Sequence, residues 1–295
     1  MKKYILLDDQ SIAIGGTNLT TLSILEDRIS EVFSIPTANL SLYDIRTNTD
    51  KIWIIGNIMN FLNSTNHEII YELFRTVKFV KLEFDYNFCI YRGEYPHKKF
   101  TGESCECPHG KTGSKILSEI YNLINKNAKH IFFMSQKQRD IFYKHLPLLD
   151  LDNSSVLSSC FSKDSLKLFK SLKDSPKNDR YAILQGYGGW HSEAKGVNEA
   201  VSYCQKNNLK YDLLPNREYE QHLESLAEYR GLVFLPIIED TCPRCTIEAK
   251  LMGLEVVTNL NSQHVSEDWW KIESETDQYL KSRTNYFWSI LDKVS

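Results

Sequence analysis

The sequence of 295 residues has no apolar run that approaches the length of about 20 residues needed to cross a membrane. Asp8 and Asp9 break the N-terminal apolar stretch, so we expect a strand there and no export signal. The seven cysteines are odd in number and follow no disulfide spacing pattern, which indicates reduced thiols in a cytoplasmic protein. The net charge of −3 provides no global electrostatic reason for binding nucleic acid.

Strand-like and helix-like segments alternate along most of the chain without an internal repeat, as is typical of α/β proteins with parallel sheets. The composition, 42% hydrophobic and 12% aromatic, indicates a globular protein, and the length suits two domains. A stretch rich in lysine, serine and aspartate at residues 162–178 is the predicted junction between them.

Residues 231–259 are the most informative stretch. They predict an apolar strand at 232–235, a polar loop, a helix capped by Thr246 with Glu248 in its first turn, and a second strand at 254–258. This order is a βα unit of a parallel sheet. Its loop follows the carboxyl end of a strand, where open α/β sheets bind ligands.

Two carboxylates, Asp240 and Glu248, frame that loop. The unpaired N–H groups at a helix start offer a site for phosphate, and a nearby carboxylate can accept hydrogen bonds from ribose hydroxyls. The unit therefore has the features of a nucleotide-diphosphate site. An ordinary βα unit, whose acids only interact with the helix dipole, is equally consistent with the same composition.

The loop also resembles a known signature. Residues 240–248, Asp-Thr-Cys-Pro-Arg-Cys-Thr-Ile-Glu, followed by Gly253 and a valine-rich strand, are similar to the donor site of retaining glycosyltransferases of family four. The first acid is aspartate here, where the family usually has glutamate. Lys195-Gly196 resembles the family's Lys-Gly pair at the start of a donor-domain helix, and Gly15-Gly16-Thr17 resembles its glycine-rich first loop.

One position departs from the family pattern. The family usually places an arginine about six residues before the lysine, whereas this chain has Gly188-Gly189-Trp190-His191 there. Arg244 in the donor loop, or His191, would have to supply the second cation that neutralises the diphosphate.

The resemblance implies the GT-B fold, in which two Rossmann-like α/β domains face a cleft. We expect an acceptor-side domain at residues 1–161 with an insertion at 88–115, and a donor domain at 162–265. Residues 266–295 would form a C-terminal helix that crosses back to the first domain.

The resemblance further implies that the protein transfers a sugar from a nucleotide-diphosphate sugar, with a UDP-sugar as the most favoured donor. The transfer would retain the anomeric configuration of the sugar and require no catalytic metal. Lys195, Arg244 and the helix start would stabilise the diphosphate, Asp240 would bind sugar hydroxyls and Glu248 the ribose. Asp85, after a predicted strand at 77–84, would orient the acceptor hydroxyl or simply cap a loop. The other implied donor-binding residues are Gly15, Gly16, Thr17, Gly189, His191, Cys245 and Thr246.

The segment 88–115 lacks apolar periodicity and is rich in cysteine, histidine, glycine and lysine. Cys89, Cys105, Cys107 and His109 could form a tetrahedral zinc site. Their Cys-x-Cys-x-His spacing is tighter than that of common zinc motifs, so a loop with unligated thiols remains the alternative.

The acceptor stays open at this point: a saccharide or glycan precursor is one option, and a modified base in phage DNA is another. The compact length and the insertion resemble phage-borne members that carry out DNA modification. A non-catalytic protein that binds nucleotide sugars is an alternative of a different class. A dehydrogenase is disfavoured, because the glycines at 186–191 lack the dinucleotide-binding spacing.

Overall fold

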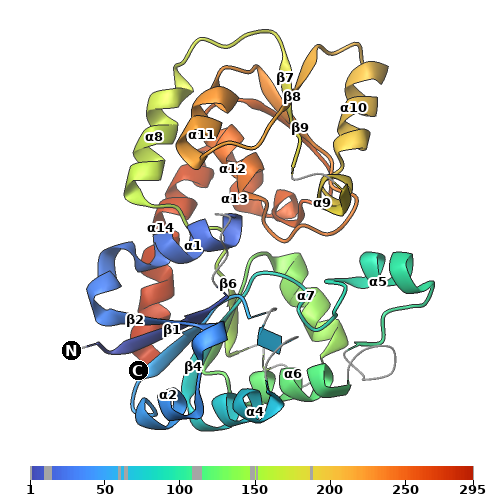
Figure 1. Ribbon diagram of the computed structural model, residues 1–295. Helices are drawn as coiled ribbons and strands as arrows, with labels where there is room; N and C mark the ends of the chain where they lie inside the picture. The colour runs from blue at the N-terminus through green and yellow to red at the C-terminus, as the bar shows by residue number, and fades with distance from the viewer. Residues whose placement is uncertain are drawn as a thin grey trace. The chain divides into compact units, whose positions relative to one another are not determined.

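Parallel strands form two separate sheets, each flanked by helices (Figure 1). The computed structural model describes residues 2–9, 15–58, 61–62, 66–107, 115–146, 150, 152–186 and 189–294, without the side chains of 190, 191 and 273. The chain divides into one unit of residues 1–160 with 282–295 and a second unit of residues 161–281. Every described helix is too short or too polar to cross a membrane.

The first sheet has six parallel strands in the order β2-β1-β3-β4-β5-β6. Tyr4 lies opposite Val32 on one side of β1 and opposite Ile52 on the other. The strand order thus reverses between β1 and β3, and ligands of open α/β sheets bind beyond the carboxyl ends of strands at such switch points. The strands are β1 (Tyr4–Asp8), β2 (Val32–Pro36), β3 (Ile52–Ile55), β4 (Lys78–Glu83), β5 (His130–Phe133) and β6 (Ser154–Val156).

Helices cover this sheet, so its strands are apolar along most of their length, as in β3, where Trp53, Ile54 and Ile55 are fully buried. Phe74 of α4 and Ile120 of α6 join one core with Phe79 of β4. The helices are α1 (Gly16–Leu25), α2 (Leu42–Thr47), α4 (His67–Thr76), α5 (Glu94–Thr101), α6 (Lys115–Asn127) and α7 (Gln136–His145).

The last helix, α14 (Glu273–Val294), contributes its C-terminal part to the first unit. The indole N–H of Trp288 donates to the carbonyl oxygen of Ile24 at 2.8 Å. Two hydrogen bonds of 2.7 and 2.8 Å join the guanidinium of Arg28 to the carboxylate of Asp292. These contacts attach residues 282–294 to α1 and to the segment that follows it.

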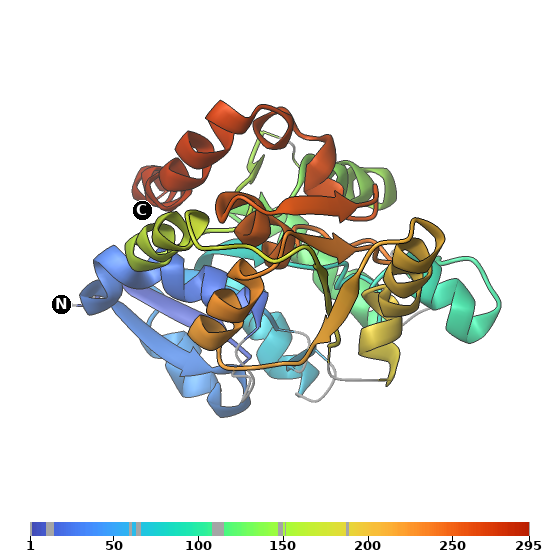
Figure 2. The same ribbon diagram turned by 90° about the horizontal axis from the view of Figure 1, so that it is seen from above.

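The second sheet has four parallel strands in the order β10-β9-β7-β8, and its switch point lies between β7 and β9. The helix α10 packs against β7 and β9 on one face, while α8 and α12 lie on the other (Figures 1 and 2). The strands are β7 (Tyr181–Leu184), β8 (Tyr211–Leu214), β9 (Gly231–Phe234) and β10 (Glu255–Thr258). The helices are α8 (Lys163–Lys173), α9 (Gly189–Ala194), α10 (Val197–Lys206), α11 (Tyr219–Ala227), α12 (Arg244–Leu251) and α13 (Asp268–Lys271).

Two polar segments of the chain contain helices. The insertion at 88–115 contains the helix α5, which was not predicted because the segment lacks apolar periodicity. Glycines occupy both cap positions of this helix, Gly93 before it and Gly102 after it. The lysine-rich junction is largely the helix α8, whose first turn is capped by the hydroxyl of Ser162 and whose Phe169 is buried. In both, a few buried side chains on a polar helix are sufficient for packing.

At the carboxyl edge of the first sheet, charged side chains are buried. The ammonium of Lys81 is fully buried, donates to the carbonyl of Gly56 at 2.7 Å, and lies 3.7 Å from the Glu83 carboxylate. Asp8 accepts a 3.0 Å hydrogen bond from the backbone N–H of Asn57. A Cβ on Gly56 would lie 2.6 Å from an Asp8 carboxylate oxygen, so the glycine provides the space for this carboxyl group.

Burial raises the pKa of Asp8 from 3.8 to about 7, against the opposing charge of Lys81. The unfolded chain therefore loses this proton near pH 4 and the folded protein only near pH 7, so ionisation of Asp8 reduces stability progressively as the pH rises between these values. We predict that Asp8→Asn increases the free energy of unfolding at pH 8, by at most about 4 kcal/mol, and much less at pH 4. Denaturant unfolding at both pH values measures this, with the exposed Asp50→Asn as control; equal effects of Asp8→Asn at both pH values would contradict it.

Gly196 fixes the turn between α9 and α10 against the end of β9. Its φ of 71° is left-handed, and a Cβ there would lie 1.7 Å from the carbonyl oxygen of Leu235. The N–H of Ile237 also donates to the carbonyl of Ala194 at 3.1 Å, which joins the two segments directly. Only glycine permits this approach.

We predict that Gly196→Ala lowers the free energy of unfolding of the second unit by more than about 3 kcal/mol, because steric overlap adds to left-handed strain. Gly189→Ala is the matched control: its φ is also left-handed, at 55°, but no described atom lies within 4 Å of the added Cβ. The control should lose only the ~1–2 kcal/mol of the backbone conformation. Equal losses in denaturant unfolding of the two variants would show that the Leu235 contact is unimportant.

Candidate functional site

The switch point of the second sheet brings together the ends of β7 and β9 and the α9–α10 turn. Gly196 packs on Leu235. Lys195, which immediately precedes Gly196, is therefore close to the loop that follows β9. Its ammonium is 2.5 Å from a carboxylate oxygen of Asp240 and 5.8 Å from the ring centre of Phe234. Lys195 and Asp240, far apart in sequence, thus form an ion pair at the carboxyl end of the second sheet.

Backbone hydrogen bonds hold the Asp240 loop in place. The N–H of Asp240 donates to the carbonyl of Asn261 at 2.8 Å, and its carbonyl accepts from the N–H of Gln263 at 3.0 Å. The side chain of Asp240 is 14% exposed and that of Lys195 is 49% exposed. The ammonium is therefore partly in solvent, where it can exchange its carboxylate partner for an anionic ligand.

Glu248 lies in a second, buried cluster. Its carboxylate accepts hydrogen bonds from the Tyr219 hydroxyl at 2.8 Å and from the Arg244 guanidinium at 3.2 Å. Arg244 also donates to the Tyr219 hydroxyl at 3.3 Å, and its guanidinium carbon lies 4.0 Å from the ring centre of Phe161. Burial raises the pKa of Tyr219, so the phenol stays protonated and acts as a donor.

The helix α12 begins at Arg244 with Pro243 in the N-cap position, three residues before the predicted cap, Thr246. The prediction that Thr246 caps the helix is wrong: its hydroxyl donates backward to the Pro243 carbonyl at 2.8 Å. Glu248 consequently lies in the second turn. The fixed φ of proline is compatible with a helix start, and this favours the earlier beginning.

Cys245 and Thr246 follow in the first turn. Burial raises the pKa of the Cys245 thiol, as does the nearby Asp240 carboxylate, so this cysteine is not an ionised nucleophile at neutral pH. The Thr246 hydroxyl lies 3.2 Å from Nε2 of His264. Burial lowers the pKa of His264 to about 3, which keeps the imidazole neutral.

The remaining predicted donor-binding residues lie in different places. Gly189 begins α9, whereas the side chain of His191 lies outside the described part of the structure. Gly15 precedes α1, and Gly16 and Thr17 are its first residues, in the first unit and on the protein surface or half-buried.

Asp85 follows β4 and has the contacts of a loop-capping residue. Its carboxylate accepts from the N–H of Tyr86 at 2.8 Å and pairs with the Arg92 guanidinium. Its side chain is 23% exposed.

The structure also adds two residues that sequence reasoning missed. Tyr219, the partner of Glu248, lies 29 positions earlier in a helix whose pattern does not distinguish it from other surface tyrosines. His97 lies with three of the four predicted zinc ligands, Cys89, Cys105 and Cys107, and the ligand atoms of all four residues are within 4.8 Å of one another. The fourth predicted ligand, His109, lies outside the described residues.

A half-exposed cation, a carboxylate and a helix start at a switch point form a suitable site for an anionic ligand that carries hydroxyl groups. No family model and no curated protein sequence matches the chain. Solved structures do resemble it. The crystal structure of Anabaena Alr3699/HepE in complex with UDP-glucose is 13% identical, with a TM-score of 0.54 over 99% of this chain and 98% of that one.

Two further structures resemble the chain along almost its whole length. Sucrose-phosphate synthase from Thermosynechococcus elongatus is 10% identical, with a TM-score of 0.57 over 98% of this chain and 96% of that one. A glycosyltransferase from Rickettsia africae is 12% identical, with a TM-score of 0.52 over 100% and 99%. At such identity the likeness establishes the fold alone. The predicted fold class is confirmed: the chain has two Rossmann-like α/β domains of the GT-B type.

Proposed function

We propose that the protein is a retaining glycosyltransferase that transfers a sugar from a nucleotide-diphosphate sugar, with a UDP-sugar as the favoured donor. The observation that carries the proposal is the Lys195–Asp240 pair at the switch point of the second sheet. Asp240 lies in the same short segment of the chain as the buried Glu248 carboxylate. The likeness to HepE, whose structure contains UDP-glucose, supports the choice of donor.

In this proposal, the diphosphate displaces the Asp240 carboxylate from the Lys195 ammonium. The ammonium and the N–H groups at the start of α12 then face the leaving group, where negative charge grows as the glycosidic bond breaks. Groups that are fixed in place before the reaction stabilise such charge without reorganisation. Asp240, once released, accepts hydrogen bonds from hydroxyls of the donor sugar.

Glu248 accepts hydrogen bonds from the ribose. Tyr219 and Arg244 hold its carboxylate in one orientation, so Arg244 acts as a positioning residue. The Arg244 guanidinium pairs with Glu248 and faces Phe161, and these partners support this role over direct contact with the diphosphate. His191 then remains the candidate for the second cation.

The acceptor is a saccharide or glycan precursor, or a modified base in phage DNA. The salt dependence of acceptor binding distinguishes the two. Affinity for DNA falls steeply as the salt concentration rises, whereas affinity for a neutral saccharide does not. Metal is not required for the chemistry, since the lysine and the helix dipole oppose the diphosphate charge.

The function is tested by incubating the protein with a panel of UDP- and GDP-sugars, with and without saccharide and DNA acceptors, and measuring release of the nucleotide diphosphate. We expect release from UDP-sugars, accelerated by one acceptor class. Tight binding of UDP-sugars without turnover under any condition would instead identify a non-catalytic binding protein.

For Lys195→Ala we predict a fall in kcat of about 100-fold with a modest change in KM for the donor, because the ammonium acts mainly on charge that develops in the transition state. Lys210→Ala is the matched control, since Lys210 also pairs with an aspartate, Asp179, at 2.5 Å but precedes β8 at the opposite end of the sheet. Turnover of Lys195→Ala within a few-fold of the parent protein would refute this role.

For Glu248→Gln we predict that the dissociation constant for UDP rises about 10- to 100-fold, since an amide is a weaker acceptor for ribose hydroxyls than a carboxylate. Glu255→Gln provides the control: Glu255 has a similar set of partners, Arg230 and Tyr181, at the amino end of the sheet. Calorimetric titration measures both, after thermal unfolding has shown that each variant is folded. An unchanged dissociation constant in Glu248→Gln would rule out contact with the ribose.

A further inference from the structure

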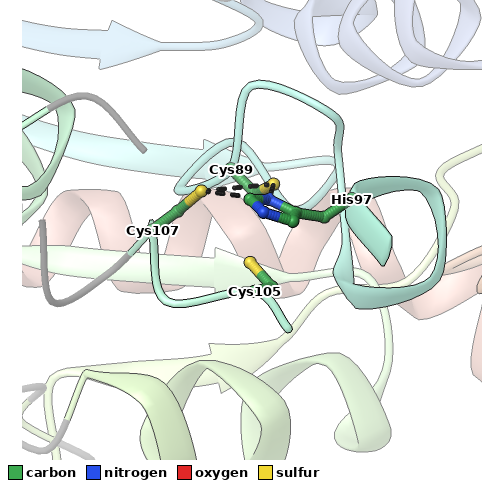
Figure 3. Close-up of side chains that lie close together, drawn as sticks. All are labelled: Cys89, His97, Cys105 and Cys107. Atoms are coloured by element: carbon green, nitrogen blue, oxygen red, sulfur yellow. Dashed lines mark hydrogen bonds between the residues drawn. The ribbon is translucent and has the colours of Figure 1, made fainter. Parts of the chain in front are cut away.

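The segment that follows β4 folds back on itself and brings three thiols and an imidazole together (Figure 3). Cys89 lies in the loop before α5, His97 lies within α5, and Cys105 and Cys107 lie beyond its end. Two left-handed glycines make the reversals: Gly93, with a φ of 136°, precedes the helix, and Gly102, with a φ of 76°, ends it.

The ligand atoms of Cys89, His97 and Cys107 are spaced as ligands of one tetrahedral ion, and the Cys105 sulfur lies within 4.8 Å of each of them. The sulfurs of Cys89 and Cys107 are 3.6 Å apart, and they lie 3.4 and 3.3 Å from Nδ1 of His97. Zinc with bonds of about 2.3 Å to sulfur and about 2.0 Å to nitrogen places two sulfurs about 3.8 Å apart, and sulfur and nitrogen about 3.5 Å apart. The observed separations differ from these by only about 0.1 to 0.2 Å, which is the tolerance expected for a metal site.

Neither a disulfide nor simple packing of thiols accounts for the cluster as well as a metal ion does. A disulfide requires sulfurs about 2.0 Å apart, and all three cysteines are free. Packing of small apolar thiols leaves the buried imidazole with weak partners: Nδ1 faces only sulfur, and Nε2 makes no hydrogen bond within the described part of the chain. A buried polar ring without strong partners destabilises the folded protein, because its nitrogens lose their hydrogen bonds to water.

One aromatic ring packs against the imidazole. The ring of Tyr91 meets His97 edge to face at 5.1 Å and stacks on Phe100 at 5.7 Å. Cys89 and Cys107 are fully buried, and Cys105 is half-buried. This environment excludes most water from the four ligand atoms, as is usual for an ion held for structural purposes.

We propose that Cys89, His97, Cys105 and Cys107 bind one zinc ion in a closed, structural site. Three thiolates and one imidazole form a ligand set typical of tetrahedral zinc. Four protein ligands complete the coordination and leave no position for a substrate or a water molecule, so the ion has no direct part in catalysis.

The proposed zinc site lies in the segment that follows the carboxyl end of β4 in the first sheet. It connects the loop after β4 to α5 and to the chain beyond, and the same loop contains Arg92, which pairs with Asp85. Zinc therefore fixes the segment that begins at the carboxyl end of a central strand, where polar side chains of an open α/β sheet meet their ligands. The inference is independent of the proposed reaction, because it depends only on residues 89–107.

The first test is the metal content of protein purified without chelators and without a polyhistidine tag. We expect about one zinc per chain by elemental analysis. Replacement by Co²⁺ should produce the visible bands of tetrahedral cobalt and a thiolate-to-metal charge-transfer band. Protein that contains no zinc and gives no such spectrum with Co²⁺ would overturn the proposal, whether or not any variant folds.

The second test assigns the ligands. Cys105→Ser and His97→Ala should weaken zinc binding more than 10-fold in competition with a chelator, because loss of a ligand exceeds the ~10- to 100-fold effect of losing an outer-shell partner. Cys204→Ser, at a buried free cysteine of α10, and His109→Ala should keep the zinc. Loss of zinc in His109→Ala together with its retention in His97→Ala would overturn the assignment of the imidazole ligand.

Discussion

The carbonyl oxygen of Leu235 leaves no room for a side chain at residue 196, and this single steric constraint organises the candidate site. Because Gly196 accepts a left-handed backbone, the α9–α10 turn can lie directly on the end of β9. Lys195 is thereby carried to Asp240, on a loop 45 positions later in the sequence. In the Lys-Gly pair, the glycine thus allows the turn to lie close to the end of β9, and the lysine places a positive charge there.

The two sheets have the same kind of switch point but use charge differently there. At the edge of the first sheet, Lys81 and Glu83 are buried and paired, and Asp8 is largely withdrawn from water. At the edge of the second, the Lys195 ammonium stays half-exposed. Breaking a buried ion pair leaves an uncompensated charge away from water, so such a pair is poorly suited to bind another ion. A partly solvated pair is weak, so it can change partners with a small change in free energy. This contrast favours the second unit as the place where an anionic ligand binds.

The alternation of apolar runs and polar turns was sufficient to predict an α/β protein with parallel sheets, and the family resemblance implied the GT-B fold. The predicted strands at 232–235 and 254–258 agree with β9 and β10 to within one residue at each end. Sequence reasoning failed where tertiary contacts decide. Nothing in the local pattern shows that Tyr219 reaches Glu248, or that proline at 243 moves the helix start ahead of Thr246. The role of Arg244 likewise depends on its burial against Phe161, which composition does not reveal.

The proposed zinc ligands also show that sequence spacing alone does not predict tertiary contacts. Spacing along the chain suggested His109, which is close to Cys107 in sequence, whereas the fold brings His97 from within α5. A helix places its side chains by rotation about its axis, so a residue distant in sequence can meet a sulfur that its chain neighbours do not. The same segment has little apolar periodicity and cannot rely on a core of its own to order it. Four ligands on one ion would supply the cross-links that hydrophobic burial does not, since metal binding to a preformed set of ligands adds directly to the free energy of folding. A polar insertion can therefore be as well fixed as the strand from which it emerges, which is what a residue such as Asp85 requires if it is to orient a substrate.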